Sequence, residues 1–181
     1  MRLNQRIILK NGKEALLRNG GYSDGKAVYE LFNAIHAETD FLLAYSDENC
    51  FDPEQEAQFL EDRSGSINEI EIIAFVDGKA VGTAGIEAIG TKYKTRHRAE
   101  LYISVLKDYW GLGLGRALAE ACIQCAKDAG YVQLELTVVA ENKRAISLYK
   151  KLGFEEFGRN PKGYNSRNKG VQKLGYMLLP V

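Results

Sequence analysis

Apolar and polar side chains alternate along the middle of the chain, and a few residues later the apolar positions change their period. The alternation runs from Ala99 to Val105, and a period of two is typical of a strand. Beyond it, apolar residues recur at intervals of three and four, as on one side of a helix, at Leu114, Ala117, Leu118, Ala121, Cys122 and Cys125. Gly111, Gly113 and Gly115 stand between these two patterns. The sequence therefore predicts a strand, a glycine-rich turn and a helix in direct succession.

The same two periods predict the other elements of the fold. Strands are expected at residues 14–18, 69–76, 80–86, 133–138 and 171–179, and helices at 23–36, 53–63 and 142–152. A short strand is expected after Phe154, followed by a loop at residues 159–163. This order predicts an α/β fold with a mixed sheet.

Two local signals support these boundaries. Asp52 before Pro53 is typical of a helix start, and Asp77-Gly78 favours a hairpin turn. Gly82 and Gly85 lie inside a predicted strand, where glycine indicates a bulge or a close contact.

The glycine-rich turn has the composition of an anion-binding loop. The first N–H groups of a helix lack internal partners and its dipole favours negative charge there, while glycine lets an anion approach the backbone closely. The spacing is neither G-x-G-x-x-G nor the G-K-[ST] ending of a P-loop, because Gly115 follows Gly113 by two residues and Arg116 comes next. A phosphate-binding turn of another type is therefore predicted.

A second motif follows the strand at residues 133–138. Asn142 is a good N-cap, Gly153 is a natural helix stop, and the run between them and Phe154 reads N-x-x-A-x-x-L-Y-x-x-x-G-F. Together with the glycine turn, this run resembles the GCN5-related N-acetyltransferases (GNAT superfamily). The resemblance covers roughly residues 98–158. Trp110 departs from the family pattern, which usually has Gln or Arg there.

The resemblance implies a GNAT-like, mostly antiparallel central sheet flanked by helices, and acetyl transfer from acetyl-CoA to an amine, with no metal. Backbone groups of the glycine turn would hold the pyrophosphate, and those of Ile103 and Val105 would pair with the pantetheine arm. The cofactor-binding set expected from this comparison is Ile103, Val105, Trp110, Gly111, Gly113, Leu114, Gly115, Arg116, Asn142 and Tyr149.

Two residues are expected to move protons. The resemblance makes Tyr149 the acid that protonates the CoA thiolate, whereas its spacing alone favours an aromatic residue of the core. Because a primary ammonium must lose a proton before it attacks, a base is also needed. Glu100 is the first candidate and His97 the second, with proton relay through water as the alternative.

The acceptor site is less well defined by the sequence. Glu38, Thr39 and Asp40 are either ligands for a cationic amine or ordinary caps and turn residues. The basic loop at residues 162–173 is either a solvated turn or a contact for the 3′-phosphate of the adenosine or for an acidic acceptor.

Composition narrows the range of partners. The chain of 181 residues, with 24 basic and 24 acidic side chains, is expected to form one domain over residues 1–181. The balanced charge predicts no binding to nucleic acid or to a membrane surface, and no apolar run reaches the ~20 residues of a membrane span. Cys122 and Cys125 are expected in the core, and the odd cysteine count favours a reducing, cytoplasmic location.

Three functional hypotheses remain at this stage. The first is an N-acetyltransferase acting on a small molecule or a protein amine by direct attack in a ternary complex. The second is an acyltransferase that uses another acyl-CoA, and the third is a non-catalytic acyl-CoA-binding sensor. A homodimer is left open.

Overall fold

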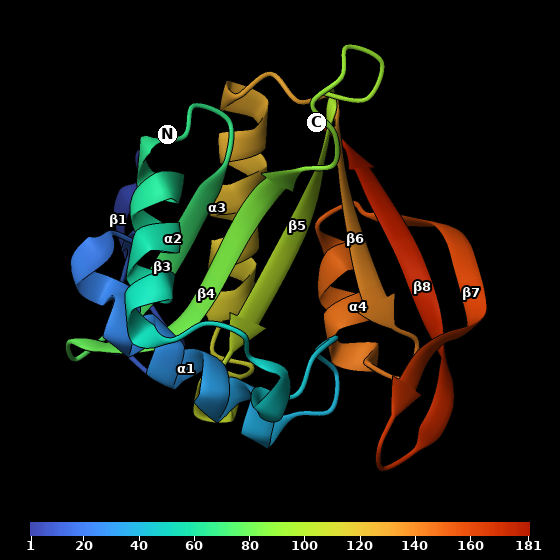
Figure 1. Ribbon diagram of the computed structural model, residues 1–181, viewed down its shortest axis with the longest axis horizontal. Coiled ribbons are helices and arrows are strands. Elements are labelled where there is room, and N and C mark those ends of the chain that lie inside the picture. The colour runs from blue at the N-terminus through green and yellow to red at the C-terminus, as the bar shows by residue number, and fades with distance from the viewer.

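The computed structural model describes residues 1–181, which form one eight-stranded sheet with helices on both faces (Figure 1). The strands are β1 (Asn4–Ile8), β2 (Glu14–Asn19), β3 (Ile70–Val76), β4 (Lys79–Ala88), β5 (Arg98–Val105), β6 (Gln133–Val139), β7 (Glu155–Ser166) and β8 (Gly170–Pro180). The helices are α1 (Gly25–Glu38), α2 (Pro53–Gly65), α3 (Leu114–Asp128) and α4 (Lys143–Lys151).

The sheet is antiparallel except at its centre. Its order is β1-β2-β3-β4-β5-β6-β8-β7, and only β5 and β6 pair in parallel. α1 and α2 cover one face while α3 packs on the other, against β3, β4 and β5 (Figure 1). The predicted α/β class with a mixed, mostly antiparallel sheet is confirmed.

Local signals in the sequence fix several boundaries. Asp52 accepts hydrogen bonds from the N–H groups of Glu54 and Gln55, so it caps α2 as predicted. Asp77 and Gly78 both have positive φ, 51° and 77°, which is the conformation expected of the hairpin between β3 and β4. Gly153, at φ 97°, follows α4 as predicted.

Two expectations about strands are wrong. β1 is not predicted because most of its side chains are exposed, so it lacks an alternating pattern and pairs with β2 through backbone groups. Residues 159–163 were expected as a loop but lie within β7. The pairing of β7 with β8 skips register between Asn160 and Tyr164, and this irregularity accommodates Pro161 within an edge strand.

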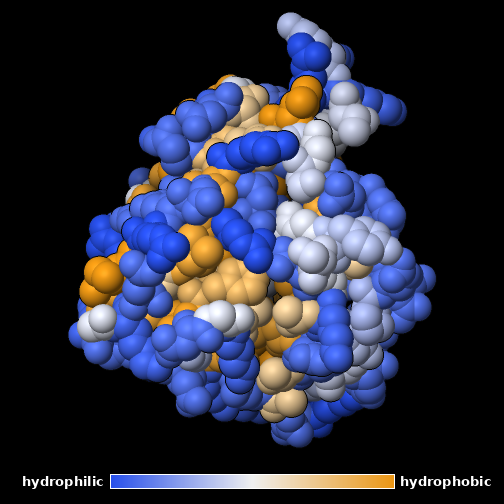
Figure 2. Space-filling model, turned by 90° about the vertical axis from the view of Figure 1, so that its left-hand side faces the viewer, coloured by the Kyte–Doolittle hydropathy of each residue, from blue (hydrophilic) through white to orange (hydrophobic).

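The surface beside β1 combines hydrophilic side chains with a recessed apolar area that they surround (Figure 2). Below the surface, Cys122 and Cys125 are buried in the core on α3, which confirms their predicted packing role. None of the helices combines the length and the apolar composition needed for a membrane span.

Candidate functional site

A cleft of about 750 Å³ opens where β5 and β6 separate. The two strands pair only through Arg98–Glu100 and Gln133–Glu135, and beyond these residues they diverge with α4 beside the gap (Figure 1). Residues of β5, β6, the glycine turn, α3 and α4 line the cleft, together with the segment that follows α1. We call it the donor cleft.

The free edge of β5 presents backbone groups to the donor cleft. The Leu106 N–H donates to Val81 on β4 at 3.0 Å, so the backbone groups of even-numbered residues face β4. The His97 carbonyl accepts from Val132, beside β6, at 2.9 Å, so those of odd-numbered residues face the β6 side. Because backbone groups alternate direction along a strand, those of Ile103 and Val105 point toward the cleft. The Val105 carbonyl already accepts the Trp110 indole N–H at 2.6 Å, which leaves the Val105 N–H and both groups of Ile103.

The glycine turn adopts the conformation that its composition predicts. Gly111 and Gly113 have φ of 78° and 96°, which disfavours any other residue, and Gly113 stands immediately before α3. The first helical hydrogen bond is donated by Ala117 to Gly113 at 3.1 Å, so the three preceding N–H groups, of residues 114–116, have no helical partner. Space beside both glycines is open, since an added Cβ would meet nothing within 4 Å.

The side chains of two members of the predicted cofactor-binding set have other contacts in the chain. The Leu114 side chain is fully buried in the core and does not line the cleft. The Arg116 guanidinium borders the cleft but bonds Glu120 one turn along α3, at 2.8 Å. Trp110, Gly111, Gly113, Gly115, Asn142 and Tyr149 all line the cleft.

Three further cationic side chains border the donor cleft and were missed by the sequence reasoning. They are Lys10, Arg144 and Lys151, and the Arg144 guanidinium lies 5.0 Å from the centre of the Trp110 ring. Lys10 lies between β1 and β2, whereas Arg144 and Lys151 both belong to α4, at positions that the second motif leaves unspecified. The basic segment at residues 162–173 contributes no residue to the cleft, and its Arg167 pairs with Asp47 at 2.7 Å. This arrangement is in line with the alternative interpretation as a solvated turn, and a contact to the 3′-phosphate stays a prediction.

Tyr149 lies near the end of α4, where it packs in the core and also lines the donor cleft. It is 8% exposed and packs edge-on against Phe154, with ring centres 5.8 Å apart. Burial raises the pKa of the phenol to about 12, and no hydrogen bond within the chain offsets this shift. Asn142 caps α4 by accepting from the Ala145 N–H at 3.1 Å, as predicted.

Of the two predicted bases, only Glu100 reaches the donor cleft. Its carboxylate is exposed at the cleft wall and accepts a hydrogen bond from Thr137 at 3.3 Å. Partial desolvation raises its pKa, and the neighbouring carboxylates of Glu87 and Glu135 add to the effect. His97 is exposed outside the cleft, in the segment before β5.

The structure adds a base candidate that the sequence did not indicate. His36, in the last turn of α1, stacks on Phe32 with ring centres 3.6 Å apart, and its Nδ1 lies 2.7 Å from the Phe32 carbonyl. Because a carbonyl only accepts, Nδ1 is the protonated nitrogen and Nε2 keeps its lone pair. Burial lowers the pKa of the imidazole, which keeps it neutral at physiological pH.

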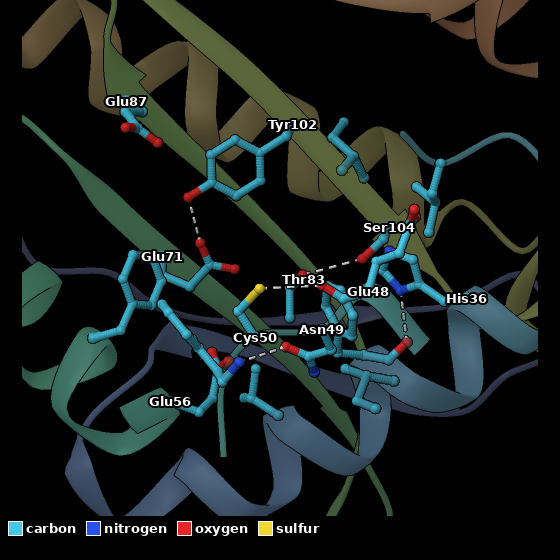
Figure 3. A pocket seen from close by; sticks show the side chains of 17 residues that line it. His36, Glu48, Asn49, Cys50, Glu56, Glu71, Thr83, Glu87, Tyr102 and Ser104 are labelled. Carbon is cyan, nitrogen blue, oxygen red and sulfur yellow. Dashed lines mark hydrogen bonds between the residues drawn. The ribbon is translucent and has the colours of Figure 1, made fainter. Parts of the chain in front are cut away.

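A second cavity, of about 480 Å³, lies between the sheet and the two helices α1 and α2 (Figure 3). We call it the acidic cavity, because Glu48, Glu56, Glu71 and Glu87 are among the residues that line it. It adjoins the donor cleft, and five residues border both: His36, Leu42, Tyr102, Ile103 and Ser104.

Glu71, on β3, is the most unusual residue of the acidic cavity. It is 6% exposed and accepts a hydrogen bond from the Tyr102 hydroxyl at 2.6 Å (Figure 3). Burial raises the pKa of its carboxyl to about 7, although the Tyr102 hydrogen bond favours the ionised form. Glycine at position 85 makes this contact possible, since a Cβ there would overlap the Tyr102 hydroxyl, so the predicted close contact at Gly85 is confirmed.

The acidic residues expected at the acceptor site have other partners. Glu38 accepts from the Lys107 N–H at 2.8 Å, and Asp40 accepts from the hydroxyls of Tyr45 and Ser166 at 2.9 and 2.5 Å. They hold the segment after α1 against the turn that follows β5 and against β7, in line with the alternative interpretation as turn residues. Neither they nor Thr39 line the acidic cavity, although Thr39 lines the donor cleft.

Comparisons with known proteins agree with this architecture. The model of the Acetyltransferase (GNAT) family matches residues 26–154. A crystal structure of a GNAT-family acetyltransferase from Streptococcus pneumoniae superposes with a TM-score of 0.88, at 30% identity, over 92% of this chain and 99% of that one. The N-alpha-acetyltransferase of Sulfurisphaera tokodaii is 31% identical over 159 residues, which are 81% of this chain and 84% of that protein.

A more distant structure includes the donor molecule. A phosphinothricin acetyltransferase from Sinorhizobium meliloti, solved in complex with AcCoA, has a TM-score of 0.80 at 18% identity, over 92% of this chain and 88% of that one, which is a likeness of fold. Several other curated relatives match less than half of this chain, which spans 37% to 53% of their length.

Proposed function

Because the chain belongs to the acetyltransferase (GNAT) family, we propose that it transfers an acetyl group from acetyl-CoA to a primary amine. The amine belongs to a small molecule or to a protein, and it attacks the thioester directly while both substrates are bound. The observation that carries this proposal is the donor cleft itself, in which a free strand edge leads to a glycine turn at a helix N-terminus.

The residues of the donor cleft fit acetyl-CoA along its length. The N–H groups of residues 114–116 and the dipole of α3 favour the pyrophosphate. Lys10, Arg144 and Lys151 supply positive charge around it. The backbone groups of Ile103 and the Val105 N–H are placed to pair with the amides of the pantetheine arm as a neighbouring strand would. One of these N–H groups also polarises the thioester carbonyl in this proposal.

Tyr149 is the proposed general acid. When the amine attacks the thioester, the C–S bond breaks and the electron pair leaves on sulfur, which then takes a proton. Burial keeps the phenol protonated and leaves its hydroxyl without an internal partner. A thiolate that leaves into the same desolvated region is a stronger base than in water, which offsets the raised pKa of the phenol.

Glu100 is the proposed base, acting directly or through one water molecule. Its raised pKa brings the carboxylate closer to the range in which it can accept a proton from an ammonium group. His36 is the second candidate because its Nε2 lone pair lies on a side chain shared by both cavities.

The pH dependence of kcat/KM separates these two bases. Glu100→Gln should lower activity at neutral pH and let it recover as the pH approaches the pKa of the amine, near ~10. His36→Asn keeps a donor toward the Phe32 carbonyl and should leave the profile intact. The opposite pattern, with the acid limb lost only in His36→Asn, would transfer the role to His36.

A thiol-release assay tests the proposed reaction. The protein should release CoA from acetyl-CoA in the presence of amines, with an acetylated amine as product. Faster release from succinyl-CoA would favour the second acyltransferase hypothesis. Binding of acetyl-CoA without release for any amine in a panel of amino acids, polyamines, aminoglycosides and N-terminal peptides would favour the sensor.

A further inference from the structure

The acidic cavity has a one-sided charge. Four carboxylates, of Glu48, Glu56, Glu71 and Glu87, are among its lining residues, and no lysine or arginine is (Figure 3). The imidazole of His36 is neutral at physiological pH because burial lowers its pKa. Most of the remaining wall is apolar, from Val28, Leu31, Phe32, Leu42, Phe51, Phe59 and Ile103.

Two of the four carboxylates have no cation of their own. Glu87 pairs with Arg63 at 3.1 Å, and Glu48 lies 3.7 Å from Arg167. Glu71 has the hydroxyls of Tyr102 and Thr83 and forms no ion pair, although Arg63 is near enough to lower its pKa, and the Glu56 side chain has neither a hydrogen bond nor an ion pair. A buried carboxylate without a partner is unfavourable, so this arrangement calls for a cation from outside the chain.

Glu56 gives a second and independent indication of a ligand. It lies on α2, is 8% exposed, and borders the same cavity as Glu71 on β3 (Figure 3). Its carboxylate therefore borders a space in which the protein provides no partner for it.

The position of this charge relative to the donor cleft limits the ligand. Glu71 faces Gly85, which in turn faces Tyr102 on β5. Tyr102 and Ser104 border both cavities and are separated by roughly 7 Å along the strand. A molecule that reaches from the carboxylates to the donor cleft therefore passes the residues that the two cavities share, among them Leu42 and Ile103.

We propose that the acidic cavity binds the distal ammonium of an acceptor that has two amino groups joined by an aliphatic chain. Glu71 and Glu56 bind one ammonium, the apolar wall contacts the chain, and the other amine reaches the donor cleft. The placement of the second amine at the donor cleft rests on the proposed acetyl transfer. The binding of the distal ammonium in the acidic cavity does not depend on that reaction.

Calorimetric titration of the purified protein tests the binding. Cadaverine, with amines at both ends of its carbon chain, should bind at least ~10-fold more tightly than n-pentylamine, which lacks the distal charge. Glu71→Gln and Glu56→Gln should each weaken cadaverine roughly 10-fold and leave n-pentylamine unchanged. Glu61→Gln, on an exposed position of α2, removes the same charge outside the cavity and should have no effect. Equal affinities of the two amines for the wild type would overturn the proposal.

Turnover of the same two amines separates this proposal from the proposed function. Release of CoA with both amines at equal kcat/KM would support acetyl transfer and contradict the distal site. Selective binding of cadaverine without release of CoA for any amine would support the distal site and contradict acetyl transfer.

Discussion

The donor cleft and the acidic cavity adjoin each other but are built from different parts of the chain. The donor cleft uses backbone groups of β5 and of the glycine turn, within one continuous stretch from Arg98 to Arg116. The acidic cavity uses side chains from α1, α2, β3, β4 and β5. Backbone recognition constrains glycines and strand register, so it leaves a sequence motif. Recognition by dispersed side chains leaves none, so only the fold reveals it.

The largest effect on acetyl-CoA binding is expected from a substitution in the glycine turn of the donor cleft. Gly113→Val places a β-branched residue at φ 96°, and its side chain fills the open space beside the turn. We expect acetyl-CoA affinity to fall on the order of 10²-fold. The wild type should gain about 2.7 kcal/mol of unfolding free energy at 100 times the Kd, and the variant almost none.

Gly130→Val is the matched control for backbone strain. Gly130 also has positive φ, 78°, and open space, but it follows α3 at the end away from the glycine turn. It should lose stability like Gly113→Val and still respond to acetyl-CoA in a thermal shift measurement. An equal response from both variants would show that the turn does not bind the donor.

Removal of a single hydroxyl tests the chemistry of the donor cleft. Tyr149→Phe keeps the packing against Phe154 and should lower kcat about 10²-fold, with little change in the KM for acetyl-CoA. Tyr131→Phe removes the hydroxyl of another buried tyrosine, which accepts from Asn68 at 2.9 Å, and should leave kcat unchanged. Unchanged kcat in Tyr149→Phe, with chemistry rate-limiting, would return Tyr149 to a packing role.

Gly113→Val and Tyr149→Phe change the donor cleft, which is the part of the site that could be predicted from the sequence. The strand at 98–105, both motif helices and the cap of α4 follow from alternation, helical spacing and capping chemistry. β1 could not be predicted, because an edge strand with exposed side chains lacks the apolar face that produces an alternating pattern. The burial of Glu71 and Glu56 could not be predicted, because the sequence of a strand or helix does not show which neighbours will cover a carboxylate.

The buried carboxyl of Glu71 in the acidic cavity should make the free energy of unfolding depend on pH. The folded-state pKa of Glu71, about 7, lies above the model value, so its neutral form stabilises the fold. That contribution is fully present below the unfolded pKa of ~4.3 and is lost as the pH rises through 7. Between pH 5 and 8 the wild type should lose about 2 kcal/mol relative to Glu71→Gln, measured by urea unfolding. Parallel stability curves would place the carboxylate in solvent.

A smaller effect is expected from crowding the acidic cavity without changing its charge. Gly85→Ala introduces a Cβ that would lie 2.7 Å from a Glu71 carboxylate oxygen and overlap the Tyr102 hydroxyl, so the hydrogen bond between them should break. We expect the KM for cadaverine to rise about 10-fold while the KM for acetyl-CoA stays constant. Gly65→Ala, with open space at the end of α2, should change neither value.

The central claim is that an acceptor amine attacks the thioester in the donor cleft while both substrates are bound. Initial rates measured against acetyl-CoA at several fixed cadaverine concentrations test it most directly. Direct attack predicts double-reciprocal lines that intersect. Parallel lines would instead indicate a covalent acyl-enzyme. The thiol of Cys50, on the wall of the acidic cavity, would then be the first nucleophile to examine, and the account of a ternary complex would be contradicted.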